Sequence, residues 1–158
     1  MRAPIEIEFR IGKPAYATGN FVYVWVSGES GPFYVGETGK SMADRCGLHI
    51  RDPSRSGAIV AARISKHPHQ QYAAFGFHIE DKLWHLVAAE NHATPSGANC
   101  NRARKAIERK VYEVLKEQFP GMHPGRGCTW KAEAAKEFAE DILKYFTSRN
   151  AGAGSGMT

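Results

Sequence analysis

The fold is decided by residues 21–39, FVYVWVSGESGPFYVGETG, in which two aromatic and β-branched runs flank a short polar turn. Residues 21–27 and 33–36 have the side chains that strands favour, and the turn between them is rich in Gly, Ser and Pro. The stretch therefore predicts an antiparallel hairpin, with its first run buried on both faces. Each run carries a tyrosine, Tyr23 or Tyr34, and either could be a core residue or a chemically active one.

Periodicity and turn residues predict the remaining elements. Ser41 is a candidate N-cap with Asp44 three residues later, a variant of the capping box, so we expect a helix from there to about residue 50. Residues 82–90 fit either a helix or a strand. The other expected elements are a strand at 4–10, a loop at 52–57, a short helix from about 59 that ends before Pro68, a strand at 73–80, a polar loop at 92–101, a long helix at 102–119 and a last helix at 131–149.

Length and composition limit the architecture. A chain of 158 residues with 42% hydrophobic residues suits one domain with one core. We predict an α/β fold of the α+β type, with a small, mostly antiparallel central sheet of three or more strands flanked by helices. Residues 1–150 should form this single domain, and residues 151–158, which are small and polar, should form a flexible tail.

Charge and cysteine content restrict the class of partner and the compartment. The net charge of +5 and the pI of about 9.2 favour a polyanionic partner. Three widely spaced cysteines without a C-x-x-C pair suggest reduced thiols and a cytoplasmic protein. The sequence has no apolar run long enough for a membrane span and no signal peptide at its start, so we expect no membrane association.

Two helices carry candidate chemistry. Arg45 and His49 are four residues apart on the helix after the hairpin, which places both side chains on one face. Glu108 lies beside the apolar stripe of the long helix. Cys46-x-x-His49 has a spacing typical of zinc ligands, but no second close pair exists, and a buried free thiol is the simpler interpretation of Cys46.

Together these residues resemble the GIY-YIG nuclease family. Phe21-Val22-Tyr23 is similar to the first signature of the family, and Tyr34-Val35-Gly36 is similar to the second. The resemblance continues through Arg45 and His49 to the glutamate helix, in which Ile107-Glu108 begins the matching pattern, and spans residues 21–123. It departs from the family where phenylalanine replaces the first glycine and where His123 stands in place of a common asparagine.

The resemblance implies a metal-dependent endonuclease that hydrolyses DNA phosphodiester bonds, with Mg²⁺ or Mn²⁺ as cofactor. Its catalytic residues would be Tyr23, Tyr34, Arg45, His49 and Glu108, and Glu108 would also bind the metal. Either Tyr23 or His49 is a candidate general base, since a phenol with pKa near 10 needs help whereas imidazole titrates close to neutrality. Glu90 is a rival metal ligand, because the segment before the glutamate helix is longer than the family requires.

Basic residues around these positions are candidates for contacts with the DNA backbone. They are Lys40, Arg51, Arg63, Lys66, Arg104 and His123. A homodimer would allow so small an enzyme to cut both strands. The alternative functions are a nucleic-acid-binding domain of the same fold with little or no nuclease activity, and an interaction module for an acidic protein.

Overall fold

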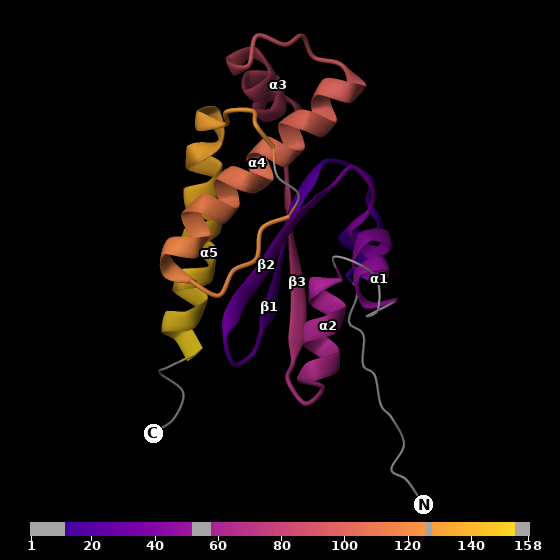
Figure 1. Cartoon of the computed structure of the whole chain (residues 1–158), viewed down its shortest axis with the longest axis vertical. Helices are drawn as coiled ribbons and strands as arrows, with labels where there is room; N and C mark the ends of the chain where they lie inside the picture. Colours follow the sequence, from indigo (N-terminus) through magenta and orange to yellow (C-terminus); the bar gives the residue numbers. More distant parts are fainter. Residues whose placement is uncertain (1–11, 52–57, 126–127, 154–158) are drawn as a thin grey trace, which may run out of the picture.

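The described part of the chain folds around a three-stranded antiparallel sheet. The computed structural model describes residues 12–51, 58–125 and 128–153, with 150–153 as backbone only. Strands β1 (Phe21–Ser27), β2 (Gly31–Thr38) and β3 (Tyr72–His78) lie in the order β2-β1-β3. Helices flank this sheet (Figure 1), so the predicted α+β class with a small antiparallel sheet is confirmed.

The predicted hairpin is present and sets the register of the sheet. Gly31 begins β2 with φ of 69°, a backbone conformation that glycine adopts without strain. The strand is longer than the predicted 33–36 because its ladder with β1 extends from the Ser27–Gly31 pair to the Phe21–Thr38 pair. Side chains on both faces of β1 are buried, as the lack of polar alternation predicts.

One face of the sheet carries the larger apolar cluster. Valines of β1 and β2 pack there against α3 (Asp81–Glu90), α4 (Gly97–Gln118) and α5 (Lys136–Ala153). Residues 82–90, for which the sequence allowed either a helix or a strand, belong to the helix α3. Among the described residues, no helix combines the length and the apolar character that crossing a bilayer requires.

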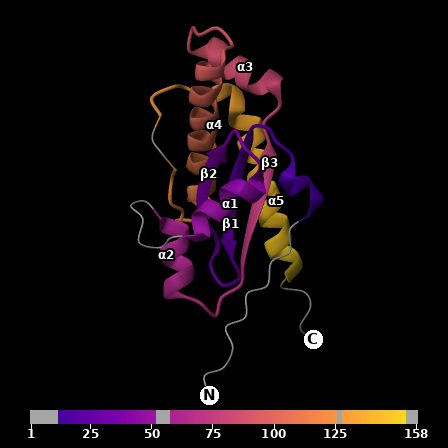
Figure 2. The ribbon, with the colours of Figure 1, turned by 90° about the vertical axis from the view of Figure 1, so that its right-hand side faces the viewer.

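The opposite face carries an aromatic cluster. Tyr23, Trp25 and Tyr34 pack there against α1 (Met42–Arg51) and α2 (Ile59–Lys66), with the short 3₁₀ helix η1 (Lys13–Tyr16) beside α1. Figure 2 shows α1 in front of the sheet, with α4 and α5 behind it. Residues on consecutive positions of β1 therefore face two different sets of helices.

Local hydrogen bonds explain where the helices begin. The Ser41 hydroxyl accepts from the Asp44 backbone N–H and donates to the Asp44 carboxylate, which confirms the predicted cap of α1. Ser96 caps α4 by accepting from the N–H of Asn99. The long helix therefore begins at Gly97, and residues 97–101 are helical, contrary to the predicted loop at 92–101.

The last helix begins later than the predicted residue 131. A 3₁₀ turn, η2 (Glu133–Ala135), precedes α5, and Glu90 accepts from the backbone N–H groups of Glu133 and Ala134 at its start. Residues 151–153 continue α5, so the predicted tail does not begin at 151. The strand predicted at 4–10, the loop at 52–57 and the remainder of the tail lie outside the described residues.

The segment after α4 returns to the sheet. His123 donates its backbone N–H to the carbonyl of Phe33 at 2.8 Å, and the Val35 N–H donates to the His123 carbonyl at 3.2 Å. This parallel bridge covers the outer edge of β2. Because His123 is held at this edge, Gly125, two residues further on, also lies near β2.

Candidate active site

Tyr23 is the centre of the candidate site. Its side chain is 0% exposed, and its hydroxyl accepts a hydrogen bond from Nε of Arg45 at 3.0 Å and lies 2.5 Å from Nε2 of His49. Both partners come from α1, where the four-residue spacing places them on one face as predicted. The β1 strand and the following helix thus bring a phenol, a guanidinium and an imidazole into direct contact.

Two glycines make room for this arrangement. Gly36 of β2 and Gly76 of β3 stand opposite Tyr23 in the two ladders. A Cβ on Gly36 would overlap the Tyr23 ring and hydroxyl, and one on Gly76 would lie 2.8 Å from the Met42 side chain of α1. Tyr23 and α1 can therefore occupy this face of the sheet only because both neighbours lack a side chain.

Tyr34 completes the aromatic part of the site. Its ring centroid lies 5.2 Å from that of His49 and 6.3 Å from that of Tyr23. The Tyr34 side chain is 7% exposed, and burial raises the pKa of its phenol above the ordinary value of 10.0. The two tyrosines of the hairpin therefore lie beside the same imidazole.

Glu108 approaches from α4, the helix on the opposite face of the sheet. Its side chain is 4% exposed, and the backbone N–H of Gly125 donates to its carboxylate. A Cβ on Gly125 would fall on that carboxylate, so the close approach requires glycine. Glu108 therefore lies on the side of the sheet where residues 123–125 run along β2.

The Glu108 carboxylate is close enough to the aromatic cluster for its charge to affect the pKa values of the two tyrosines. Burial, and then the nearby Glu37, raise the pKa of Glu108 to about 8, against the opposing effects of Arg45 and Lys105. In turn the Glu108 charge contributes to raising the pKa of Tyr34 and, as the last of several causes, that of Tyr23. Tyr23, Tyr34, Arg45 and His49 thus form one cluster of direct contacts, and Glu108 lies near enough for its charge to affect the pKa of both phenols, although α1 and α4 cover different faces.

Protonation states in the free protein follow from this environment. Burial and the Arg45 cation lower the pKa of His49 to about 4, so its imidazole is neutral at pH 7. Burial, together with Tyr34, raises the pKa of the Tyr23 phenol well above its ordinary value. A neutral Nε2 can accept the phenolic proton while Arg45 donates to the phenolic oxygen. Tyr23 and His49 therefore form one hydrogen-bonded pair, and both remain candidates for the base.

The residues present fit a magnesium-type ion bound mainly by substrate and water. In the described ranges, no group of three or more His, Cys, Asp or Glu side chains converges as a ligand set. Glu108, however, has a buried carboxylate whose ionisation is opposed first by burial and then by a second carboxylate, Glu37. A divalent cation beside it would relieve that repulsion, and one carboxylate plus phosphate oxygens is a common way to hold Mg²⁺.

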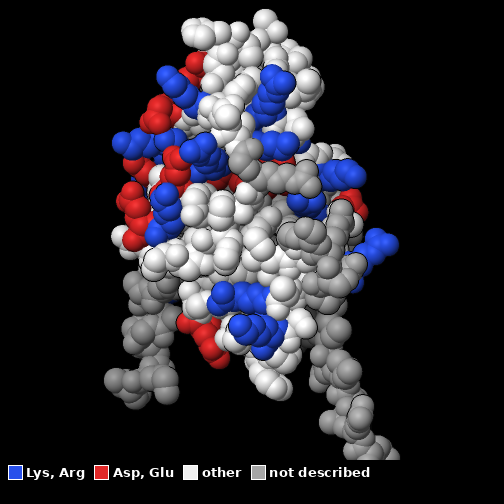
Figure 3. Space-filling model, in the orientation of Figure 1, with Lys and Arg blue, Asp and Glu red and all other residues white. Residues whose placement is uncertain are grey.

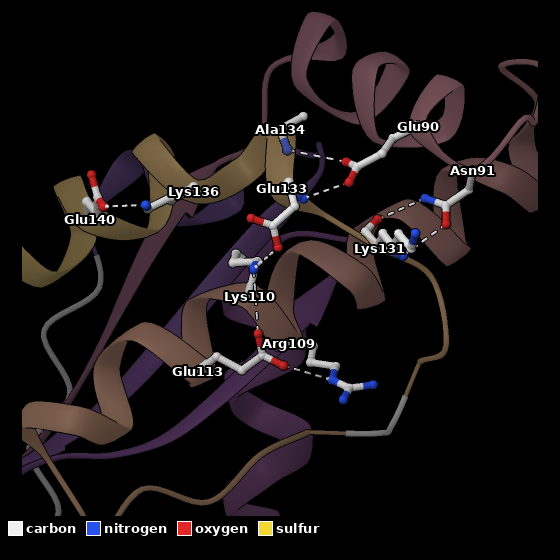
Figure 4. A network of polar contacts seen from close by, with 10 residues as sticks. All are labelled: Glu90, Asn91, Arg109, Lys110, Glu113, Lys131, Glu133, Ala134, Lys136 and Glu140. Carbon is white, nitrogen blue, oxygen red and sulfur yellow. Dashed lines mark hydrogen bonds and ion pairs between the residues drawn. The ribbon is translucent and has the colours of Figure 1, made fainter.

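Glu90, the rival ligand, belongs to another part of the molecule. Figure 4 shows it accepting hydrogen bonds from the backbone of η2, within a network that joins α3, α4 and η2 through ion pairs such as Lys110–Glu133. Its contacts among the described residues are with that segment and not with Tyr23. The structure therefore does not bring Glu90 into the candidate site.

The six predicted DNA contacts fall into two groups. Lys40, Arg51, Lys66 and His123 are exposed. Arg63 instead lies over the Phe33 ring at 4.5 Å and donates to Ser30, and Arg104 is paired with Glu37 at 2.7 Å. Figure 3 shows Lys and Arg near α2, whereas over α4 and α5 they alternate with Asp and Glu.

Two residues near the site, Glu37 and Gly125, were missed by sequence reasoning. Glu37 immediately follows the second signature, so it adjoins a position that had been identified. Gly125 had no local signal, because only the return of the chain to β2 brings it to Glu108. Cys46 packs against the aromatic cluster, and burial raises the pKa of its thiol to about 11, as expected for a structural cysteine.

Comparisons with protein-family models, curated proteins and solved structures find no match to this chain. The functional interpretation therefore rests on the geometry of the site and on the resemblance of its motifs.

Proposed function

We propose that this protein is a metal-dependent DNA endonuclease of the GIY-YIG type. The main support is the environment of the Tyr23 hydroxyl, which contacts Arg45 and His49, while the buried carboxylate of Glu108 is near enough for its charge to affect the pKa of Tyr23. Phosphodiester hydrolysis needs a proton acceptor, a cation for the phosphate and a ligand for a metal ion. His49 and Arg45, candidates for the first two, contact this hydroxyl, and Glu108 is the candidate for the third.

Arg45 would bind the scissile phosphate. Its Nε is used by Tyr23, and its terminal nitrogens have no partner among the described residues. A planar guanidinium presents two further N–H groups to phosphate oxygens, whereas lysine offers a point charge without the fork. The contact with Tyr23 would also hold the attacking water and the phosphate in a fixed relation.

Tyr23 and His49 would together remove the proton of the nucleophile. As water attacks phosphorus, its proton passes to the Tyr23 oxygen and the phenolic proton passes to Nε2 of His49. The bond between phosphorus and the leaving oxygen breaks, and that oxygen takes up the negative charge. Arg45 opposes the imidazolium in the free protein, but a phosphate paired with Arg45 would offset this repulsion.

Glu108 would hold the ion. Bound Mg²⁺ or Mn²⁺ would stabilise the charge on the leaving 3′ oxygen as a Lewis acid. Glu108 must lose its proton to serve as a ligand, and its pKa of about 8 makes this loss depend on pH near neutrality. Tyr34, beside His49, would shield the pair from bulk water.

The positive net charge of the protein favours DNA, a polyanion, as the substrate. The chain carries a net charge of +5, and Lys40, Arg51 and Lys66 remain exposed. The proposal includes a cytoplasmic protein with reduced thiols, and a second copy of the chain for cutting both strands.

Binding without cleavage is the second candidate function. The raised pKa values of Tyr23 and Glu108 favour it, because neither group is mainly ionised at pH 7 in the free protein. Under this alternative the basic residues would bind nucleic acid and the cluster would be structural. The same experiment separates the two functions.

Supercoiled plasmid and branched DNA should be incubated with the pure protein in Mg²⁺, in Mn²⁺ or in chelator. We expect nicking or cleavage with either ion and none in chelator. Tyr23→Phe, Arg45→Lys and Glu108→Gln should each abolish the reaction, while DNA affinity in chelator changes little for Tyr23→Phe and Glu108→Gln.

Matched controls come from the same elements. Tyr72→Phe removes a hydroxyl that donates to the His67 carbonyl, in the same aromatic cluster. Glu113→Gln removes a partly exposed carboxylate of α4 that is paired with Arg109. Both should cut like the parent protein. DNA binding by a protein that never cuts would refute the nuclease proposal in favour of the second function.

A further inference from the structure

Arg104 has a set of contacts that its predicted role on DNA does not explain. Its Nε donates to Oε2 of Glu37 at 2.7 Å, and its terminal nitrogens donate to Oδ1 of Asn20 at 3.0 Å and to Oδ1 of Asn101 at 3.1 Å. The side chains of Arg104 and Glu37 are only 14% and 15% exposed. One guanidinium therefore ties together the residue before β1, the end of β2 and the helix α4.

These three segments carry three of the five candidate catalytic residues, namely Tyr23, Tyr34 and Glu108. Asn20 precedes β1, which bears Tyr23, and Glu37 follows Tyr34 and Gly36 on β2. On α4, Arg104 and Glu108 are four residues apart, so they lie one turn apart on the same helical face. The contacts of Arg104 fix this face of α4 against the hairpin.

The fit around the guanidinium is tight. A Cβ on Gly39 would lie 3.0 Å from Cζ of Arg104, so the planar group rests directly on the backbone after β2. The Sγ of Cys100, one turn earlier on α4, accepts from Nη1 of Arg104 at 3.6 Å. A planar guanidinium with several donors can reach all of these partners at once. The single ammonium group of a lysine cannot.

We propose that Arg104 is a positioning residue of the nuclease, one that holds Glu108 in place relative to Tyr23 and Arg45 and does not bind DNA. The inference rests on the proposed function. Phosphoryl transfer depends on the alignment of the metal ligand with the nucleophile, and a displacement of about 1 Å can cost about 100-fold in rate. Loss of the clamp should therefore slow the chemical step and leave DNA binding intact.

The test compares Arg104→Met and Arg104→Lys with the parent protein. Arg102→Met is the matched control, since Arg102 is an exposed arginine of the same helix that lies over the Trp130 ring. Three quantities are measured: the single-turnover cleavage rate in Mg²⁺ at saturating protein, the DNA dissociation constant in chelator at several salt concentrations, and the urea midpoint. The midpoint ensures that rates are compared for folded protein.

We expect Arg104→Met to lower the single-turnover rate about 100-fold. Arg104→Lys should give an intermediate rate, and Arg102→Met a normal one. DNA affinity should stay within about twofold, and its salt dependence should not change, whereas loss of a phosphate contact would reduce the salt slope by about one.

A second variant tests the same role without removing the Arg104 side chain, in case Arg104→Met does not fold. Gly39→Ala keeps every hydrogen-bonding group but pushes on the guanidinium, so we expect a smaller fall in rate with normal DNA affinity. A normal rate in Arg104→Met, or weaker DNA binding with a reduced salt slope, would overturn the positioning role while leaving the nuclease intact. A parent protein that does not cut would instead overturn the proposed function.

Discussion

Replacing Glu108 by Gln should make the protein more stable at alkaline pH. The side chain is 4% exposed, and burial together with Glu37 raises its pKa from 4.5 to about 8. The folded protein therefore keeps a proton that the unfolded chain has lost between these two values. The contribution of Glu108 to stability is therefore most favourable below pH 4.5, falls as the pH rises towards 8, and then levels off.

The size of the destabilisation follows from the difference between the pKa of Glu108 in the unfolded chain and that in the folded protein. At 1.36 kcal/mol for each pH unit, it corresponds to about 5 kcal/mol of destabilisation above pH 8. Water or counter-ions that enter beside the carboxylate reduce this figure, so it is an upper limit. Gln has nearly the same shape and can still accept from the Gly125 N–H, but it cannot ionise.

Urea denaturation of both proteins, in chelator at pH 5 and pH 8.5, measures the effect. At pH 5 the two free energies of unfolding should agree within about 1 kcal/mol, and at pH 8.5 Glu108→Gln should be more stable by up to about 5 kcal/mol. Glu113→Gln should show no such divergence. Equal stability of Glu108→Gln and the parent at pH 8.5 would refute the assignment of a destabilised carboxylate to Glu108.

Other outcomes follow from the packing. Gly36→Ala should destabilise the protein by more than about 2 kcal/mol, because its Cβ would overlap the buried Tyr23, whereas Gly47→Ala, with nothing within 4 Å, should stabilise α1 by up to about 1 kcal/mol; urea midpoints measure both. Ser96→Ala removes the cap of α4 and should cost about 1 kcal/mol in the same assay, and an unchanged midpoint would contradict the role of the cap. Cys46, whose thiol pKa is raised to about 11, should react with iodoacetamide at pH 8 far more slowly than in urea, and equal rates would show that it is not buried.

The sequence predicted the features that depend on local pattern. The hairpin followed from β-branched and aromatic runs around a turn, and the start of α1 followed from Ser41 and Asp44, because the chemistry of each is complete within a few residues. The contact of Tyr23 with Arg45 and His49 also follows locally, since a hairpin and the next helix have few ways to pack. The nuclease roles of these residues stay predictions.

Features made by the return of the chain could not be predicted. Gly125 contacts Glu108 only because His123 pairs with β2. A bridge of two hydrogen bonds between segments that are distant in sequence has no local sequence pattern that would predict it. The engagement of Arg104 by Glu37 and Asn20 likewise depends on how α4 lies on the sheet. Charge alone could not distinguish this buried arginine from a residue that is exposed to DNA.

The most direct test of the account is to locate a metal ion and a phosphate in the site. Crystals of Tyr23→Phe bound to duplex DNA and Mn²⁺ would show the ion by its anomalous scattering. We expect the manganese peak at about 2.2 Å from a Glu108 oxygen, with a backbone phosphate on the Arg45 guanidinium. A peak at Glu90, or DNA bound on a face that leaves Arg45 without a phosphate, would contradict the proposed active site.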